Sequence, residues 1–123
     1  MMNAISWVEV PVADMDRAIK FYNTVFGWEL KRVDLGNLVM AWFPWDHEGT
    51  GSAGSLVMNS NYKPSERGPL VYFHCKDVAT QVGRVEAAGG KVLRAKMQVS
   101  PEFGYMALAI DSEGNRIAFH SSN

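Results

Sequence analysis

The sequence lacks several features that would point to particular classes of protein. With one cysteine, Cys75, in 123 residues, the chain can form no internal disulfide and no cysteine-based metal site. Its 12 basic and 13 acidic residues give a net charge of −1 without a Lys or Arg cluster, which argues against nucleic acid and membrane surfaces as partners. No apolar run approaches the roughly 20 residues of a membrane span. The N-terminus also lacks a basic segment followed by an apolar block, so we expect a cytoplasmic protein.

What is present is an internal repeat, in which the second half of the sequence follows the layout of the first at an offset of 63 residues. The offset pairs Val8 with Val71, Val10 with Phe73, Val12 with Cys75, Asp14 with Asp77 and Gly27 with Gly90. Each half predicts a strand, a helix and three further strands. We therefore expect an α+β fold of two βαβββ modules that bury their faces together.

The first module is expected over residues 5–59 of a single domain spanning residues 1–123. Apolar alternation through Val8 and Val10 predicts a strand with one face in the core. Asp14 then caps a helix that Gly27 ends, and strands follow over residues 28–34, 37–43 and 54–59. The intervening segment 44–53 is rich in Gly and acidic residues and is expected to be a mobile loop.

The second module is expected over residues 69–121, after a connection over residues 60–68 that is rich in turn-forming residues. Asp77 caps its helix, whose predicted apolar stripe consists of Val78, Val82, Val85 and Ala88. Gly89 and Gly90 are expected to end that helix. Strands over residues 91–99, 105–110 and 116–121 complete the module, with a turn over residues 112–115.

Two phrases of the sequence, VPVADMDRAIKFYNTVFGWE in the first module and DSEGNRIAFHS near the end, resemble the vicinal oxygen chelate superfamily. That superfamily includes glyoxalase I, bleomycin-resistance proteins, fosfomycin-modifying enzymes and extradiol dioxygenases. The resemblance implies that the modules curl their sheets into a partial barrel with the helices outside. It further implies a concave cleft that holds a divalent metal and the substrate, and a homodimer.

The metal ligands that the resemblance implies are missing from this sequence. The family's first-strand histidines fall on Trp7 and Leu70, and the glutamate of the last strand falls on Ala118. The remaining ligand falls within Leu56, Val57 and Met58, none of which is a ligand for a hard or borderline metal ion. We therefore expect no metal and no other cofactor.

Polar side chains lie two positions from the lost ligands, about 7 Å along the same strand face. They comprise Glu9 on the first strand, Tyr72 and His74 on the fifth strand, and Arg116 and His120 on the eighth strand. Three interpretations of Glu9 stay open: a salt bridge to Arg116 or a neighbouring Lys, a general base beside Trp7, or simple exposure.

The histidines also have more than one interpretation. His74 and His120 could bind or catalyse, or could only face solvent and bond the backbone. A noncanonical metal site of Glu9, His74 and His120 is a further alternative. His47, in the 44–53 loop, is expected to be solvated, and Cys75 is expected to be a buried, inert thiol.

Aromatic residues form the last notable group. Trp42, Phe43, Trp45 and Tyr105 could grip a flat ligand at the mouth of the cleft. Alternatively, half of them pack in the core and the others cover a subunit interface.

Three hypotheses of function follow. In the first, a metal-independent protein binds a small, partly apolar molecule through Trp7, Trp42, Leu70 and Tyr72, oriented by polar side chains. In the second, a lyase or isomerase uses Glu9 as general base, with His120 or Arg116 stabilising charge. In the third, the cleft is vestigial and the chain is a protein interaction module.

Overall fold

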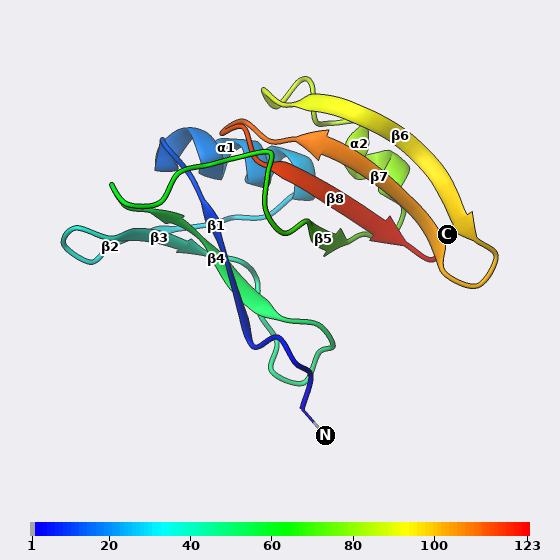
Figure 1. Cartoon of the computed structure of the whole chain (residues 1–123), viewed down its shortest axis with the longest axis horizontal. Coiled ribbons are helices and arrows are strands. Elements are labelled where there is room, and N and C mark those ends of the chain that lie inside the picture. The colour runs from blue at the N-terminus through cyan, green and yellow to red at the C-terminus, as the bar shows by residue number, and fades with distance from the viewer. Residues whose placement is uncertain (1) are drawn as a thin grey trace.

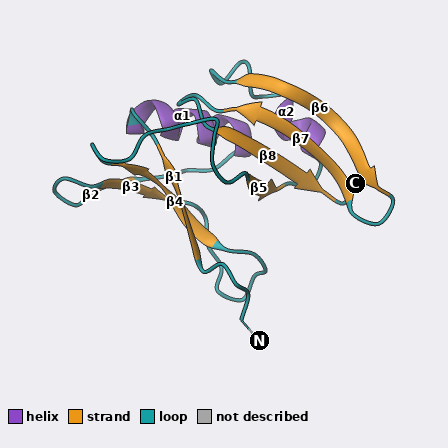
Figure 2. Ribbon diagram, viewed as in Figure 1, coloured by secondary structure: helices purple, strands orange, loops and turns teal. Residues whose placement is uncertain are grey.

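The computed structural model describes residues 2–123 as two four-stranded sheets with two helices (Figure 1). The elements are β1 (Trp7–Pro11), α1 (Met15–Phe26), β2 (Arg32–Asp34), β3 (Val39–Trp42), β4 (Ala53–Met58), β5 (Val71–His74), α2 (Val78–Val82), β6 (Lys91–Ser100), β7 (Gly104–Ile110) and β8 (Arg116–Ser121). Both helices lie on one side of the sheets (Figure 2). Each half thus contains the strand, helix and three strands that the repeat predicts.

The two sheets have the same internal order, β1-β4-β3-β2 in the first and β5-β8-β7-β6 in the second. In both, the first strand pairs in parallel with the last strand of its own module. The strands β1 and β5 are therefore edge strands of their sheets, and helix α1 joins the two modules through Phe26, which packs on Phe73 and Phe119. The α+β fold of two βαβββ units in a partial barrel is confirmed.

Helix α1 begins and ends where its capping residues predict. The Asp14 side chain accepts a hydrogen bond from the Arg17 backbone N–H at the N-terminus, and Gly27 adopts the left-handed conformation at the C-terminus, with φ of 72°. One face is fully buried and includes Phe21, Tyr22 and Val25. This face brings α1 into contact with both modules.

The prediction for the second helix was wrong in its length. Helix α2 ends after Val82, and residues 83–89 continue as hydrogen-bonded turns. After Gly83, backbone bonds of the i to i−3 type appear, such as Arg84 N–H to Gln81 O, because glycine is a weak helix former. Val85 is nevertheless fully buried, so the apolar stripe packs as predicted although the helix does not continue.

The first module's middle strands are shorter than predicted. Strand β2 starts at Arg32 rather than at residue 28, because Trp28 stacks on Phe26 with ring centroids 4.3 Å apart and the Leu30 N–H bonds to the Asn23 side chain. These contacts hold residues 28–30 against α1. Strand β3 covers Val39–Trp42 only.

Aromatic rings from both modules form the centre of the core. Phe26 of α1 lies 5.1 Å from Phe73 of β5 and 5.6 Å from Phe119 of β8, measured between ring centroids. Phe43 packs edge-on against Phe73 at 5.5 Å. The partial burial of Phe43 and Tyr105 against this core agrees with the interpretation in which half of the aromatic group packs inside.

The turn over residues 111–115 joins the modules through buried polar contacts. Asp111 is 3% exposed and accepts a hydrogen bond from the Tyr22 hydroxyl at 2.6 Å. The Asn115 side-chain amide donates to Pro11 O at 2.7 Å, and its oxygen accepts from the Ser65 N–H at 3.0 Å. The strand β1, the helix α1 and the connecting segment are therefore all tied to one turn of the second module.

Glu113 adds a charged contact to the same turn. Its carboxylate accepts from the backbone N–H groups of Ala13 and Asp14 and from the Arg17 guanidinium, at 2.7–2.9 Å. Burial raises the pKa of Glu113, but the bonds from Arg17, Asp14, Ser112 and Ala13 outweigh burial and hold that pKa below its usual value. The carboxylate therefore also caps the start of α1.

Candidate functional site

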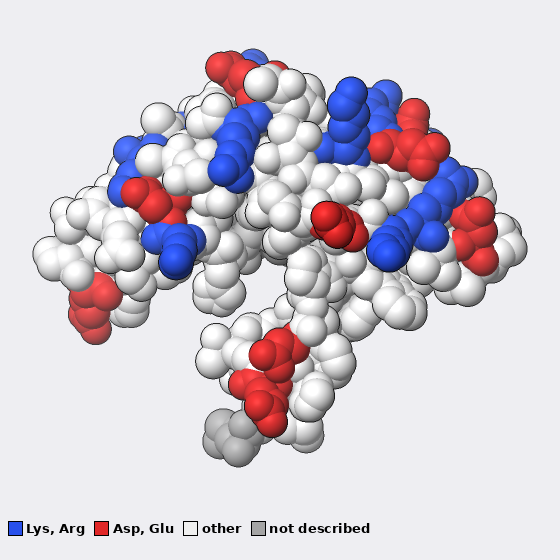
Figure 3. All heavy atoms as spheres, turned by 180° about the vertical axis from the view of Figure 1, so that it is seen from behind, with Lys and Arg blue, Asp and Glu red and all other residues white. Residues whose placement is uncertain are grey.

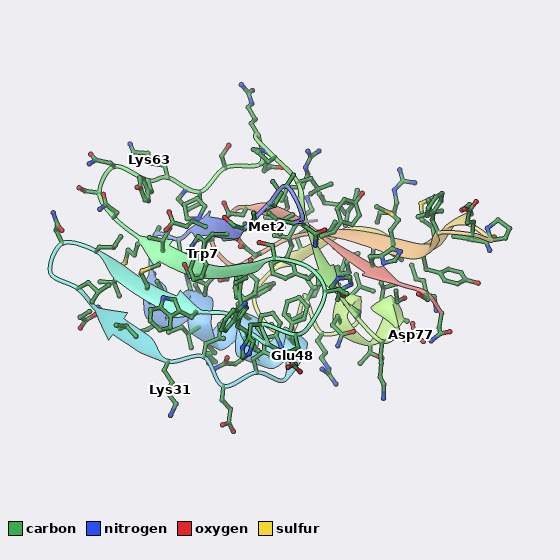
Figure 4. All side chains as sticks on the ribbon, turned by 90° about the horizontal axis from the view of Figure 1, so that it is seen from below. Met2, Trp7, Lys31, Glu48, Lys63 and Asp77 are labelled. Atoms are coloured by element: carbon green, nitrogen blue, oxygen red, sulfur yellow. The ribbon has the colours of Figure 1, made fainter. Side chains whose placement is uncertain are left out.

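A pocket of about 660 Å³ lies where the modules meet. It is lined by strand β1, by the starts of β5 and β8, and by the segment that connects the modules. Figure 4 shows Trp7 of β1 and Lys63 of the connecting segment, which both belong to this lining. The volume falls in the range that holds small organic molecules.

The alternation along β1 decides which of its side chains can reach a ligand. Val10 is buried in the core, whereas Trp7 is 45% exposed and Glu9 is also exposed on the opposite face. Trp7, Glu9 and Pro11 all line the pocket. The outward-facing residues of the strand thus contribute one indole, one carboxylate and one pyrrolidine ring, and Val8 and Val10 also border the pocket.

Glu9 does not form the salt bridge considered for it. Among residues 2–123 there are four ion pairs, and Glu9 belongs to none of them. It faces solvent and lies opposite Ser55 in the parallel ladder between β1 and β4. Of the three interpretations, exposure matches the geometry, and the carboxylate is accessible from the pocket.

The second module contributes three of the predicted residues to the same pocket. Leu70 lies just before β5, Tyr72 lies on β5, and Arg116 begins β8. Tyr72 is 52% exposed. The pocket therefore has an apolar part made by Trp7, Leu70 and Tyr72 and a polar part that includes Glu9 and Arg116.

Four other predicted residues lie outside this pocket lining. Ala118, which was also considered as a ligand contact, pairs with Tyr72 and is fully buried. Trp42 is 56% exposed at the end of β3. His74 and His120 are neighbours in the β5–β8 ladder, and the His120 Nε2 lies 2.5 Å from Phe103 O. The backbone contact considered for His120 is therefore present.

The family's metal positions do not fit a metal in this chain. Trp7 and Leu70 present carbon-rich groups to the pocket, and Ala118 is a buried methyl. For the first module's last strand, the register pairs Val57 with Pro11, so Val57 shares the face of the pocket and Leu56 points into the core. None of these side chains is a metal ligand.

The noncanonical alternative also finds no support in the geometry. Across residues 2–123, no three His, Cys, Asp or Glu side chains are grouped closely enough to hold an ion. Glu9 lines the pocket, whereas His74 and His120 do not.

Sequence reasoning missed the contribution of the connecting segment. Lys63, Ser65 and Arg67 line the pocket, although the segment was interpreted only as a link between the modules. The available signal was the presence of two cations and three hydroxyl-bearing residues within a short polar stretch. What fixes its course is the Ser65 bond to Asn115, which sequence alone did not indicate.

The loop 44–53 and Cys75 complete the set of candidates. Trp45 is 65% exposed, and its ring centroid lies 5.3 Å from that of His47, which is also exposed. Cys75 is half-buried, and burial raises the pKa of its thiol to about 11. The raised pKa agrees with the prediction of an inert thiol at Cys75, but the thiol is half-buried rather than buried as predicted.

Two surface properties bear on the classes of partner considered above. No helix within residues 2–123 has the length and apolar character to cross a membrane. On the face that Figure 3 draws, Lys and Arg side chains are interspersed with Asp and Glu side chains.

Comparison with known proteins gives consistent matches. Residues 5–41 match the family described as bleomycin resistance protein-like N-terminal. A glyoxylase-like domain-containing protein of Didymella fabae is 26% identical over 112 residues, which cover 90% of this chain and 88% of that protein.

Solved structures share the fold at low identity. A glyoxylase/bleomycin resistance protein/dioxygenase domain from Frankia sp. EAN1pec superposes over 100% of both chains with a TM-score of 0.73 and 14% identity. Glyoxalase I from Zea mays superposes with a TM-score of 0.71 and 23% identity over 94% of this chain. The chain spans only 45% of the maize chain.

The module repeat, the sheet order and the sequence matches agree with one another. The chain has the fold of the glyoxalase/bleomycin resistance protein/dioxygenase domains, and its first module resembles bleomycin-resistance-like proteins in sequence.

Proposed function

We propose that this protein binds a small, partly apolar molecule in the pocket between its two modules, without the help of a metal ion. The observation that carries the proposal is a 660 Å³ pocket whose lining includes exposed aromatic rings at the junction of the modules. Pockets of this kind, mostly apolar with a few polar groups, are typical of small-molecule sites.

Within this proposal, the side chains have separate tasks. Trp7, Leu70 and Tyr72 supply contact area for the apolar part of the ligand, and Glu9 and Arg116 orient its polar atoms. Trp42, His74 and His120 would be reached only by a ligand that extends beyond the pocket along the same face.

The experiment is a thermal-shift screen of small metabolites and aromatic antibiotics, followed by titration of each hit against Trp7→Ala. Binding in the pocket predicts that this variant keeps its fold and loses affinity for the hits, since Trp7 is only half-buried. The matched control is Trp45→Ala, which removes an exposed indole outside the pocket lining and should leave affinity unchanged. Hits that bind both variants as tightly as the wild type would place the ligand elsewhere.

Metal independence has its own test. Protein purified without a histidine tag or chelator should contain well below one equivalent of Ni, Zn, Fe or Mn by elemental analysis. The physical reason is that Trp7, Leu70 and Ala118 stand where the family has ligands. A stoichiometric metal that survives dialysis would defeat this part of the proposal.

An enzymatic function is the second candidate, because Glu9 is accessible in the pocket and has no ion-pair partner among residues 2–123. A lyase or isomerase of this kind would use Glu9 to remove a proton next to a carbonyl, with Arg116 stabilising the developing negative charge. Glu9→Gln should then abolish turnover and leave the melting temperature nearly unchanged. Glu29→Gln makes the same chemical change at an exposed position outside the pocket lining and should keep full activity.

The third candidate, an interaction module with a vestigial cleft, predicts no hits in the ligand screen and a solvent-filled pocket.

We further propose a homodimer in the cytoplasm. Trp42 and Trp45, at 56% and 65% exposure, are the large apolar groups that a second subunit would cover. Light scattering coupled to size exclusion should give twice the mass of 13.7 kDa, and a monomer would contradict the dimer without affecting the pocket.

A further inference from the structure

The pocket between the modules has an excess of positive charge. Its lining includes the cations Lys63, Arg67 and Arg116, and its single carboxylate is Glu9. None of these four residues takes part in the four ion pairs formed within residues 2–123. Three cations of the pocket thus remain available to a ligand.

Hydrogen bonds from side chains fix the backbone of the segment that carries two of the cations. Asn115 is 6% exposed and fixes the connecting segment by accepting the Ser65 N–H, while its amide donates to Pro11 at the end of β1. Arg116 follows directly in the chain. The Arg67 N–H donates to the Ser65 hydroxyl at 2.9 Å, so the segment that carries Lys63 and Arg67 is bound to the start of β8.

The apolar wall of the pocket consists of rings. Trp7 and Tyr72 present 45% and 52% of their surface, and both line the pocket together with Leu70. Rings of this kind favour a flat apolar surface in the ligand, because aromatic groups stack or pack edge-on.

We propose that the ligand of this pocket is an organic anion, in which a flat apolar body lies against Trp7 and Tyr72 and an anionic group is bound by Arg116 and Arg67, while Lys63 adds to the positive charge of the pocket. This inference rests on the proposed function and adds the charge of the ligand to it. Guanidinium groups bind carboxylates and phosphates through paired N–H donors. An excess of cations around a low-dielectric concavity also attracts anions from solution.

The position of Glu9 limits where the anionic group can lie. Glu9 also lines a second, shallower pocket of about 310 Å³ with Lys63, Tyr62, Pro11 and Val57. A like charge close to Glu9 would be disfavoured. The anionic group is therefore expected on the side of Arg116 and Arg67.

The test compares two ligands of the same shape and different charge, indole-3-acetate and its neutral amide, indole-3-acetamide. Isothermal titration should show the acid binding about tenfold more tightly than the amide, a ratio equivalent to about 1.4 kcal/mol. The preference should shrink at high salt, because the cations are exposed and are screened.

Three variants test which residues cause the preference for the acid over the amide. Arg116→Gln should reduce the affinity for the acid by about fivefold and leave the affinity for the amide unchanged, and Lys63→Gln should act in the same direction. Lys31→Gln is the matched control, since Lys31 is an exposed lysine on the opposite side of the molecule from Lys63 (Figure 4). It should change neither affinity. Melting temperatures of all three variants should stay at the wild-type value.

The outcomes separate this inference from the function on which it rests. Equal binding of acid and amide would overturn the anion preference and leave small-molecule binding intact. An effect of Lys31→Gln as large as that of Arg116→Gln would overturn the assignment of the preference to the pocket. If neither probe binds at millimolar concentration, the anion inference fails, and hits from the wider ligand screen then decide the proposed function independently.

Discussion

Removal of the Tyr22 hydroxyl should destabilise the protein strongly, although it deletes a single oxygen. Tyr22 is fully buried in α1, and its hydroxyl donates to the Asp111 carboxyl of the second module at 2.6 Å. In Tyr22→Phe, Asp111 keeps the bonds from Asn115 and Glu113 but loses its donor from the other module. A hydrogen bond to a charged group contributes about 1.5–3 kcal/mol when its partner is left buried.

The assay is urea unfolding at pH 7, which measures the free energy of unfolding. In thermal unfolding of a chain of 123 residues, a loss of about 2 kcal/mol corresponds to a fall in Tm of roughly 8 °C. Tyr62→Phe is the matched control, since Tyr62 is 46% exposed and its change should cost less than about 0.5 kcal/mol. A loss below about 0.5 kcal/mol in Tyr22→Phe would refute the reasoning, because it would mean that the bond between the modules contributes nothing net.

The same tyrosine predicts a dependence on alkaline pH. Burial first, and then the charge and hydrogen bond of Asp111, raise the pKa of Tyr22 well above its usual value of 10.0. Since the folded state binds this proton more tightly than the unfolded state, the contribution is present below pH 10 and is lost as the pH rises further. The difference in stability between wild type and Tyr22→Phe should therefore be constant from pH 7 to 9 and shrink above about pH 10.

Three further predictions concern other parts of the fold. Glu113→Gln should cost about 1 kcal/mol at pH 7. Because the pKa of Glu113 is lowered, that cost should vanish as the pH falls below the usual range of a glutamate; an unchanged cost at pH 3 in urea unfolding would contradict it. Gly90→Ala should destabilise by about 1–3 kcal/mol in the same assay, since a Cβ there would clash with the Ile110 carbonyl oxygen; wild-type stability would be the contrary result. Cys75, with a thiol pKa of about 11, should react slowly with iodoacetamide at pH 8 and fast only in urea, and equal rates would show an accessible thiolate.

Much of the fold could be predicted from local patterns. Asp14 and Gly27 bound α1 as their capping chemistry requires, and β8 covers residues 116–121 as its alternation indicates. The second helix was predicted too long, because an apolar stripe through Val85 was interpreted as continuous helix. The apolar stripe of this segment is buried, although the backbone changes to tighter turns at Gly83. Burial of a side-chain stripe therefore does not require continuous helical hydrogen bonding.

The candidate site was predicted in part. Alternation along β1 agrees with the exposure of Trp7 and Glu9 and the burial of Val10. The resemblance placed Ala118 where the family has a metal ligand, and the structure buries this residue completely. A period of two tells which face a side chain takes, but not how deeply its neighbours cover it.

The sequence by itself determined the repeated module and the loss of the metal ligands, because both depend only on the identity and spacing of residues along the chain. Trp7, Leu70 and Ala118 have no lone pair to offer in any fold. The tertiary structure alone decided that Lys63 and Arg67 share a pocket with Trp7 and Tyr72. The physical reason is that the course of the connecting segment depends on the bond between Ser65 and Asn115, a contact between residues 50 positions apart that no local pattern encodes.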